Sequence, residues 1–462
     1  MNERDLRSDK ASEKTGGTFE ETHKETGAEN ASFSESDNAS EGAGKISEKI
    51  GGSSEKAGAG ARGRRNAALF LGGQGVSMLG SMLVHYAIMW NLTLETRSGS
   101  VMMLFAVAAL LPIVFISPFA GVWADRYNKK YLINISDSCI AAVTLLMSAL
   151  FFFGIRDIWL LFACAVMRSL GQGVQAPSVG ALLTEIAPVD RLKKLNAANA
   201  GIQALCSFAA PMLSGVILSF MRIEAVMALD VATAAIGVSV VFFFVKTPKK
   251  TPKKSGKDVA GYFREMKEGA LYVVKHKFLL KFMAFALLFN LILSPATVLV
   301  PLQVARNFGA EVWRLTVTES AWSAGMVLGG VILSIWKGFK NHTFSISVAA
   351  AVFGTGLVWL GIVRDMWIYA AVNAVMGLSA PMFQTATVTL LQTKTDAEYV
   401  GRVFGVFTMI SSAAIPLGMV LFGPLGDAIS IDYIFIATGA LMLLSGLLLN
   451  FSKTMRKAGE PI

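Results

Sequence analysis

The chain has 462 residues, of which 53% are hydrophobic and only 16% charged, and its mean hydropathy is +0.54. A soluble protein of this length carries far more charge, whereas apolar runs of ~18 or more residues recur here as membrane spans require. The formal net charge of +10 does not indicate a nucleic-acid-binding protein, because most of the basic excess lies in loops between those runs.

Residues 1–65 contain Glu, Lys, Ser, Gly, Ala and Asn with almost no large apolar side chains. Such a composition cannot bury a core, so we expect a disordered tail. The tail lacks the short apolar core of a secretory signal. Arg62, Arg64 and Arg65 stand just before the first apolar run, and basic residues there predict a cytoplasmic N-terminus.

The apolar runs that follow predict an all-α membrane protein with about twelve spans, each near the ~20 residues that cross a bilayer. We place them at about residues 66–92, 100–120, 131–153, 158–183, 197–221, 225–245, 278–302, 315–336, 343–363, 366–391, 403–425 and 431–451.

Alternate loops differ in charge. One set is strongly basic, and the other holds isolated arginines, most of them beside an acid. The basic set contains Arg126, Lys129, Lys130, Arg191, Lys193, Lys194, Lys337, Lys340, Lys394, Arg402, Lys453, Arg456 and Lys457, and the other contains Arg97, Arg156, Arg222 and Arg364. Basic loops face the cytoplasm, so we expect a multi-pass protein of the cell membrane with both termini inside.

The longest internal loop, residues 246–277, divides the predicted spans into equal halves at 66–245 and 278–451, and residues 452–462 form a cytoplasmic tail. The loop begins with a lysine-rich run, Lys246–Lys254, and continues as an amphipathic stretch around Tyr262 to Val274. We expect its lysines to lie over anionic lipid headgroups, each contributing ~1 kcal/mol. A regulatory binding site is the alternative.

The two halves resemble each other. Ala176-Pro177 in the fourth run matches Ala380-Pro381 in the tenth, an offset of 381 − 177 = 204 residues. Pro211 in the fifth run matches Pro416 in the eleventh, an offset of 416 − 211 = 205 residues. A repeated offset predicts two bundles related by an axis along the membrane normal, with a cavity between them.

A charged hairpin joins the second and third runs. It reads Gly121-Val122-Trp123-Ala124-Asp125-Arg126-Tyr127-Asn128-Lys129-Lys130. The glycine permits close approach of two backbones, and the acid suits the positive end of a helix. The hairpin resembles the signature loop of major facilitator superfamily transporters, although Asn128 and Trp123 replace the usual glycine and leucine. The alternative is an ordinary basic loop.

The resemblance implies a latch that closes the cytoplasmic side, formed by Gly121, Asp125, Arg126, Lys129, Glu185 and Arg402. In the family the signature-loop acid faces the start of the eleventh helix, and a base of the loop pairs with an acid ending the fourth. Carried over, Asp125 meets the helix that begins near Arg402, and Lys129 reaches Glu185.

Arg168 lies about ten residues into the fourth run, where a charge must be paired or solvated. The sequence from Arg168 to Pro177, RSLGQGVQAP, resembles the fourth-helix motif of proton-coupled members. Its spacing suits the branch that contains macrolide-efflux proteins and siderophore (enterobactin) exporters, which are drug:proton antiporters. The alternative role of Arg168 is structural, as a hydrogen-bond donor that locks the first bundle.

Three acids inside the runs, Asp137, Asp230 and Glu319, are candidates with Arg168 for proton coupling, since desolvation makes protonation of a buried carboxylate easier. Pairing with a nearby base or capping of a helix is an equally good interpretation of each.

Substrate contacts follow only from the resemblance, because the first, fourth, seventh and tenth helices line the cavity in this family. The candidates are Gln74, Met78, Tyr86, Met89, Trp90, Gln172, Gln175, Phe285, Asn290, Asn373, Met376, Phe383 and Gln384. Methionine and aromatic side chains suit a pocket that repacks around varied apolar ligands, and packing against lipid or a neighbouring helix is the alternative for each.

The three cysteines lie inside apolar runs and the four histidines are scattered, so we expect neither a metal site nor a cofactor. With no nucleotide-binding loop, we predict a monomeric, proton-coupled exporter of drugs or amphipathic molecules, which is not an enzyme and does not bind nucleic acid. Transport of lipid, lysolipid or a metabolite such as a siderophore is one alternative. A non-transporting receptor or assembly factor on the same scaffold is another.

Overall fold

The computed structural model describes residues 65–186, 191–245, 259–336 and 338–460. Its helices are the first helix Arg65–Thr96, α2 Gly99–Arg126, α3 Lys129–Phe152, α4 Ile158–Ile186, α5 Leu192–Phe220, α6 Ile223–Ser239 with a π-helical turn at Val240–Phe244, α7 Val259–Lys275, α8 Lys277–Asn307, α9 Val312–Trp336, α10 His342–Ile362, α11 Met366–Thr393, α12 Val400–Ala428, α13 Ile431–Phe451 and α14 Lys453–Ala458. Residues 1–64 of the predicted tail and the run Lys246–Lys254 lie outside the described part.

Every predicted span is a helix, so the all-α fold class is confirmed. Eleven of the helices are long and apolar enough to cross a membrane. The remaining predicted span is α4, which has the length but carries Arg168, Gln172 and Gln175 in its middle. These polar side chains lower its hydropathy, and polar groups inside a span mark a bundle interior.

Short polar residues fix where several helices begin. Ser98, Asn128, Asn341, Asp365 and Ser430 each accept a hydrogen bond from a backbone N–H in the first turn that follows. Capping of this kind satisfies donors that have no partner within the helix. Because the caps lie in the loops, the helices extend several residues past most of the apolar runs.

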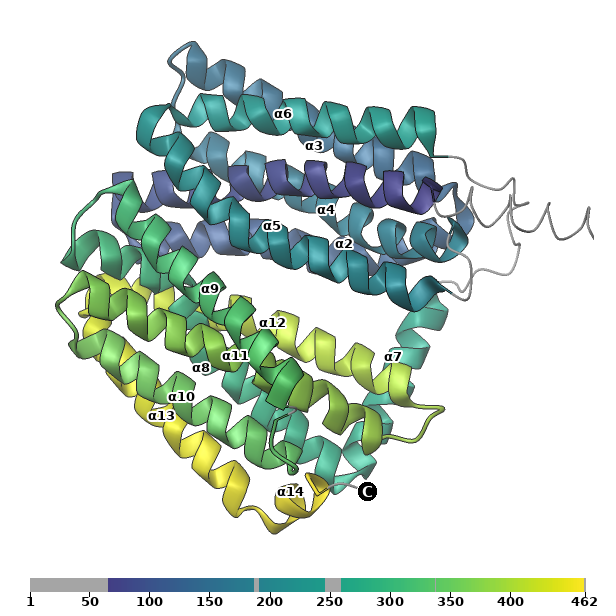
Figure 1. The fold of residues 1–462 in the computed structure, drawn as a ribbon, viewed down its shortest axis with the longest axis vertical. Coiled ribbons are helices and arrows are strands. Elements are labelled where there is room, and N and C mark those ends of the chain that lie inside the picture. The colour runs from purple at the N-terminus through teal and green to yellow at the C-terminus, as the bar shows by residue number, and fades with distance from the viewer. Residues whose placement is uncertain (1–64, 187–190, 246–258, 337, 461–462) are drawn as a thin grey trace, which may run out of the picture. The chain divides into compact units, whose positions relative to one another are not determined.

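The same packing pairs occur in both halves of the chain. In the first half α4 packs on α2 and α3, and α3 packs on α6. In the second half α11 packs on α9 and α10, and α10 packs on α13. Figure 1 shows α2–α6 grouped on one side and α8–α13 on the other. The repeated pairs are the spatial counterpart of the proline offsets in the sequence.

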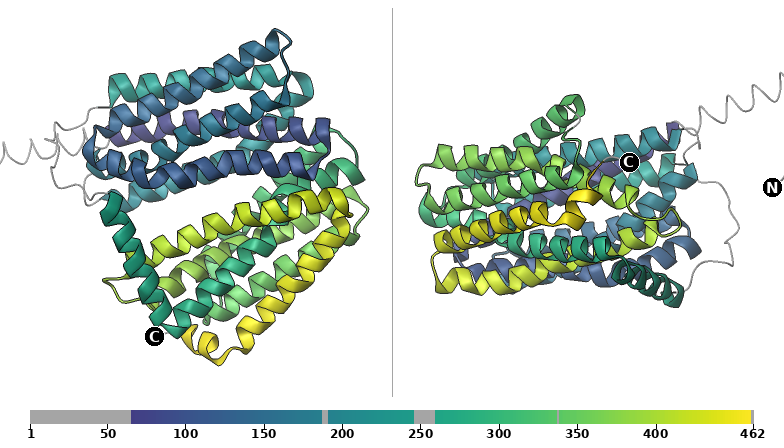
Figure 2. Two further views of the ribbon diagram at one scale, coloured as in Figure 1. Left: turned by 180° about the vertical axis from the view of Figure 1, so that it is seen from behind. Right: turned by 90° about the horizontal axis from the view of Figure 1, so that it is seen from below.

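We name the two ends of the helices by residues. At the Lys129 end α2 ends and α3 begins, and at the Asp427 end α2 begins and α12 ends. Helix α7, which covers the predicted amphipathic stretch, lies at the Lys129 end and packs on α12, as both figures of the whole fold show (Figures 1 and 2).

The bundle interior is apolar, and so is much of its outer surface. Trp90, Tyr369 and Phe289 are almost fully buried. Phe152, Phe220 and Phe451 are more than three-quarters exposed, at 78%, 86% and 78%. Large exposed apolar patches are unusual for soluble monomers, but they suit contact with lipid.

Glycines on α9 provide a test of helix packing in the second half. A Cβ at Gly325 would lie 2.1 Å from the Ala374 carbonyl oxygen of α11, whereas a Cβ at Gly330 would meet nothing within 4 Å. We predict that Gly325→Ala lowers the thermal unfolding temperature of the purified protein, with an overpacking cost of about 1–3 kcal/mol. The matched control Gly330→Ala should be neutral or slightly stabilising. Equal unfolding temperatures for the two variants would contradict this packing.

Candidate functional site

A cavity of about 280 Å³, which we call the central cavity, lies between the two halves. The first helix supplies its wall from the first half, and α8, α9 and α11 supply the wall from the second. The lining residues are His85, Tyr86, Met89, Leu293, Ala296, Thr297, Val300, Thr318, Glu319, Trp322, Asn373 and Met376. Such a lining, mainly apolar with a few polar groups, is typical of small-molecule sites.

Glu319 is the acidic side chain in this lining. It is half-buried on α9, and among the described residues nothing donates a hydrogen bond or forms an ion pair with its carboxylate. An ionisable group in a span without a protein partner is by default a candidate for function. Its carboxylate can take up a proton or pair with a cationic ligand.

His85 was not among the residues selected from the sequence. Its side chain is exposed and lines the central cavity. It also lines a smaller cavity of about 100 Å³ together with Arg168 and Gln172. The signal that could have found it is a polar residue inside an apolar run, the same signal that marks Arg168 and the three acids.

Arg168 is paired inside the first half. Its guanidinium contacts Asp230 at 2.6 Å, with side-chain exposures of only 5% and 0%. It also donates to the hydroxyl of Thr144 and, at 3.2 Å, to the backbone oxygen of Ser81. These bonds tie α4 to α3, α6 and the first helix. The contacts fit the structural interpretation of Arg168, as a donor that joins helices of the first bundle. That Arg168 takes part in proton coupling stays a prediction.

Asp137 occupies a second buried network. Gln74 of the first helix donates to one carboxylate oxygen at 3.1 Å, and Gln175 of α4 donates to the other. Gln175 also donates to the Gln74 side-chain oxygen at 3.3 Å. Neutral amides provide no counter-charge, so burial of the charged carboxylate stays energetically costly. Asp137 therefore remains a candidate for proton coupling.

The structure brings together only part of the predicted substrate set. Tyr86, Met89, Asn373 and Met376 line the central cavity, Gln172 lines the smaller cavity, and Trp90 lines a third pocket nearer the Asp427 end. The rings of Phe285 and Phe383 pack against Phe289, with centroid distances of 5.8 and 4.1 Å. Asn290 donates to the Ala286 carbonyl at 2.8 Å. Met78 is half-buried and Gln384 exposed, and neither lines these cavities.

The sequence profile of the Major Facilitator Superfamily matches residues 67–419. The chain belongs to this family. It is 26% identical over 387 residues to macrolide efflux protein A of Streptococcus pyogenes, which covers 83% of this chain and 95% of that protein. It is also 26% identical to macrolide efflux protein A of Enterococcus faecalis, covering 70% of this chain and 100% of that protein.

The fold is similar to that of solved transporters. A crystal structure of the peptide transporter POT superposes with a TM-score of 0.65 at 13% identity, and covers 84% of this chain and 95% of that one. An identity this low supports the fold alone. The chain is therefore a multi-pass membrane transporter of the Major Facilitator Superfamily, which confirms the resemblance given by the signature loop.

At the Lys129 end, the superfamily's signature loop makes one of the two expected contacts. Lys129 pairs with Glu185 at 3.0 Å. The neighbouring Lys130 donates to the carbonyls of Phe242 and Val245, at 2.8 Å each. Its positive charge offsets the partial negative charge at the C-terminal end of the sixth span. That the Lys129–Glu185 pair acts as a latch stays a prediction.

The expected contact of Asp125 with the start of α12 is absent from the described residues. Arg402 instead lies 3.6 Å from Glu268 of α7 and stacks over the Tyr399 ring. A Cβ at Gly121 would meet nothing within 4 Å. The prediction that two backbones approach closely at this glycine is therefore wrong for this structure. The reason is that α2 and α12 do not meet there, and the latch was predicted for the state in which they do.

At the Asp427 end the same two helices do meet. A Cβ on Gly99 would lie 2.2 Å from the Gly423 carbonyl oxygen. The Asp427 carboxylate accepts hydrogen bonds from the backbone N–H of Gly99 at 2.6 Å and of Ser100 at 2.8 Å, and from the Ser98 hydroxyl at 2.8 Å. An acid of the second half thus satisfies the free donors at the N-terminus of a helix in the first half.

Arg306 completes this arrangement. Its guanidinium donates to Asp427 at 2.8 Å, to the Gly426 carbonyl at 2.6 Å and to the Arg97 carbonyl at 2.6 and 3.1 Å. Arg97 has a φ of 47°, which is uncommon for a residue with a side chain. We call the contacts of Asp427 and Arg306 with residues 97–100 the Asp427 clasp.

The buried ion pair of the first half can be tested by substitution. Asp230→Asn leaves the Arg168 guanidinium buried without a counter-charge, which should lower the free energy of unfolding by about 3–5 kcal/mol. The measurement is thermal unfolding of the purified protein in detergent. The double variant Arg168→Met, Asp230→Leu should unfold at a higher temperature than Asp230→Asn alone. Wild-type stability of Asp230→Asn would rule out the pair.

The clasp can be tested by thiol accessibility. The Met103 side chain packs where Gly423 approaches α2, so a Met103→Cys reporter, with the native cysteines replaced, should react slowly with a water-soluble maleimide. Asp427→Asn puts an amide where four donors converge, from Ser98, Gly99, Ser100 and Arg306. Loss of one charge-assisted bond of ~1.5–3 kcal/mol predicts a rise in rate of about tenfold or more.

The control for this experiment is Glu311→Gln. Trp313 and Arg314 donate to the Glu311 carboxylate, and these hydrogen bonds hold its pKa below the usual range. Glu311 thus pairs within its own segment, and its substitution should leave the labelling rate unchanged. Equal rates in Asp427→Asn and wild type would show that the clasp does not hold the two halves together.

Proposed function

We propose that this transporter is a secondary active exporter of amphipathic small molecules, driven by protons and working by alternating access of its two halves. The observation that carries the proposal is the Glu319 carboxylate, which lines a cavity between the halves and has no partner among the described residues. The macrolide efflux proteins to which the chain is similar support export as the direction.

The chemistry of the central cavity favours lipophilic cations. Tyr86 and Trp322 offer aromatic faces, and Met89 and Met376 offer adaptable thioether side chains. Glu319 supplies the counter-charge. Because one carboxylate cannot hold a proton and a cation together, binding of one releases the other, which is the elementary requirement of a drug:proton antiport.

His85 extends this idea to a proton path. It lines both the central cavity and the smaller cavity that contains Arg168. An imidazole can accept a proton at one ring nitrogen and donate one from the other, so His85 can pass a proton between the Glu319 side and the Arg168–Asp230 pair. Asp137 stays a further candidate for proton coupling, reached through Gln175.

Alternating access requires that contacts at the two ends exclude one another. The described structure has the Asp427 end joined by the clasp. In the opposite state we expect the Lys129 end to close, with Asp125 at the N-terminus of α12 and Gly121 at the helix contact. The basic loops support a cytoplasmic Lys129 end, and in that orientation the described state would take up substrate from inside.

Two other functions remain as alternatives. Movement of lipid, lysolipid or a siderophore would use the same cavity with a different headgroup, and a receptor or assembly factor would not need the cavity to open. Efflux measurements separate them, because a receptor moves nothing and a lipid carrier does not expel soluble dyes. We expect a monomer in the cell membrane that contacts lipid and acts on no covalent bond of its substrate.

We predict that cells producing this chain expel a fluorescent lipophilic cation, that a protonophore stops the export, and that Glu319→Gln reduces it by about ten- to a hundredfold. The reduction corresponds to loss of one charge-assisted contact. Glu311→Gln, which makes the same change at an exposed acid just before α9, should export like the wild type.

A neutral dye of similar size and a macrolide should be tested beside the cation. Export of the macrolide alone would narrow the substrate class to that of the relatives. Retention of all three compounds in every condition would contradict the multidrug proposal and favour lipid or siderophore transport. Full export of the cation by Glu319→Gln would remove Glu319 from the mechanism.

A further inference from the structure

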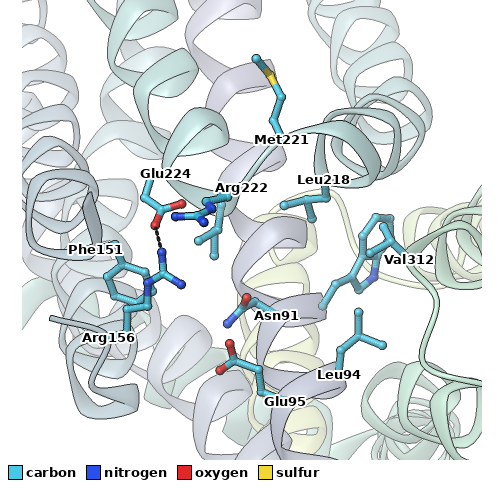
Figure 3. A pocket seen from close by; sticks show the side chains of 12 residues that line it. Asn91, Leu94, Glu95, Phe151, Arg156, Leu218, Met221, Arg222, Glu224 and Val312 are labelled. Atoms are coloured by element: carbon cyan, nitrogen blue, oxygen red, sulfur yellow. Dashed lines mark hydrogen bonds and ion pairs between the residues drawn. The ribbon is translucent and has the colours of Figure 1, made fainter. Parts of the chain in front are cut away.

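A separate pocket of about 210 Å³ lies nearer the Asp427 end, and we call it the outer pocket (Figure 3). Its walls come from the first helix, the end of α3 and the loop after it, the junction of α5 and α6, and the first residue of α9. The lining residues are Trp90, Asn91, Leu94, Glu95, Phe151, Arg156, Leu218, Met221, Arg222, Ile223, Glu224 and Val312.

The outer pocket and the central cavity follow each other along the same two helices. On the first helix, Tyr86 and Met89 line the central cavity, and Trp90 and Leu94 line the outer pocket. On α9, Val312 of the outer pocket precedes Glu319 of the central cavity by seven residues (319 − 312 = 7), or about two helical turns. The two sites are therefore distinct and lie at different depths.

Two buried polar atoms of the outer pocket lack a partner. The indole N–H of Trp90, a fully buried side chain, makes no hydrogen bond with any described residue. Glu224 is 9% exposed, and its Oε1 accepts from Arg156 at 2.7 Å while its Oε2 accepts from nothing described. Buried polar groups in native proteins are nearly always satisfied, so these two atoms are exceptions. Both are closed off from solvent, and an entering molecule would reach them only after a local rearrangement.

Two charged side chains of the lining are also without a partner. Glu95 and Arg222 are exposed and make no ion pair or hydrogen bond with the described residues. In Figure 3 Asn91 lies between them, while Leu94, Leu218 and Val312 lie on the other side of the pocket. Since the Arg156–Glu224 pair is neutral as a unit, the lining offers one free negative group, one free positive group and an apolar wall.

We propose that the outer pocket binds a small amphipathic zwitterion, of the size of an apolar amino acid. Its ammonium group would pair with Glu95, its carboxylate with Arg222, and its apolar body would rest on Leu94, Leu218 and Val312. The pocket's volume of about 210 Å³ is smaller than the 280 Å³ of the central cavity, which favours a small ligand. The proposal does not depend on export through the central cavity.

Three probes with one common phenyl body test the proposal by calorimetry on the purified full-length protein. They are L-phenylalanine, which is a zwitterion, 2-phenylethylamine, which carries the amine alone, and 3-phenylpropionate, which carries the carboxylate alone. We expect saturable binding of L-phenylalanine that is at least about tenfold tighter than binding of either partial probe, because each of those leaves one charged group of the pocket unpaired.

Variants locate the binding. Glu95→Gln and Arg222→Gln, both at exposed positions that should not affect folding, should each weaken L-phenylalanine binding about tenfold or more. Glu319→Gln in the central cavity is the control and should leave it unchanged.

Absence of saturable L-phenylalanine binding would overturn the proposal. Equal binding of 2-phenylethylamine would overturn it in favour of a cation site that does not use Arg222. Loss of binding in Glu319→Gln together with unchanged binding in Glu95→Gln and Arg222→Gln would assign the probe to the central cavity and would also contradict an outer zwitterion site.

Discussion

The contact between α2 and α12 at the Asp427 end holds the two halves of the transporter in the described arrangement. A membrane interior gives little hydrophobic drive for helix association, so such a contact depends on close backbones and on hydrogen bonds. Gly99 and Gly423 permit the approach, and the Asp427 carboxylate occupies the N-terminus of α2. Arg306 binds the same carboxylate, which makes the clasp a charge-balanced unit.

The opposite ends of the same helices carry the same pattern. Gly121 and Asp125 end α2 with the spacing that Gly423 and Asp427 show at the end of α12. In the described state the α12 acid caps α2, while the α2 acid is exposed and open space surrounds Gly121. A symmetric exchange, in which each helix caps the other in one of two states, would make the closure energies of the two ends similar. Similar energies are what a transporter needs, because a large difference would hold it in one state.

The sequence was sufficient for the fold because span length, loop charge and the offset of Pro177 and Pro381 all depend on local patterns. It also placed Arg168, Asp137, Asp230 and Glu319 inside spans, since charges there are conspicuous. The sequence could not predict which of these side chains bind one another, because the partners are far apart along the chain. Arg168 and Asp230 are 62 residues apart, and Ser98 and Asp427 are 329 apart. Gln74 and Gln175 show the same difficulty. They were predicted to contact substrate, but in the structure both donate hydrogen bonds to Asp137, which is distant from each in the sequence. His85 was missed for a different reason, since one histidine in an apolar run has no spacing pattern.

The central claim, that α2 and α12 meet alternately at their two ends, is tested most directly by spin-label distances in a cysteine-free background. One pair, Ile155→Cys with Ile429→Cys, reports on the Asp427 end, and Tyr127→Cys with Glu398→Cys reports on the Lys129 end. All four positions are exposed. The account predicts two populations, in which a longer distance at one end accompanies a shorter distance at the other, and Asp427→Asn should shift the balance toward the state closed at the Lys129 end. Distances that change together at both ends, or a single population insensitive to Asp427→Asn, would contradict it.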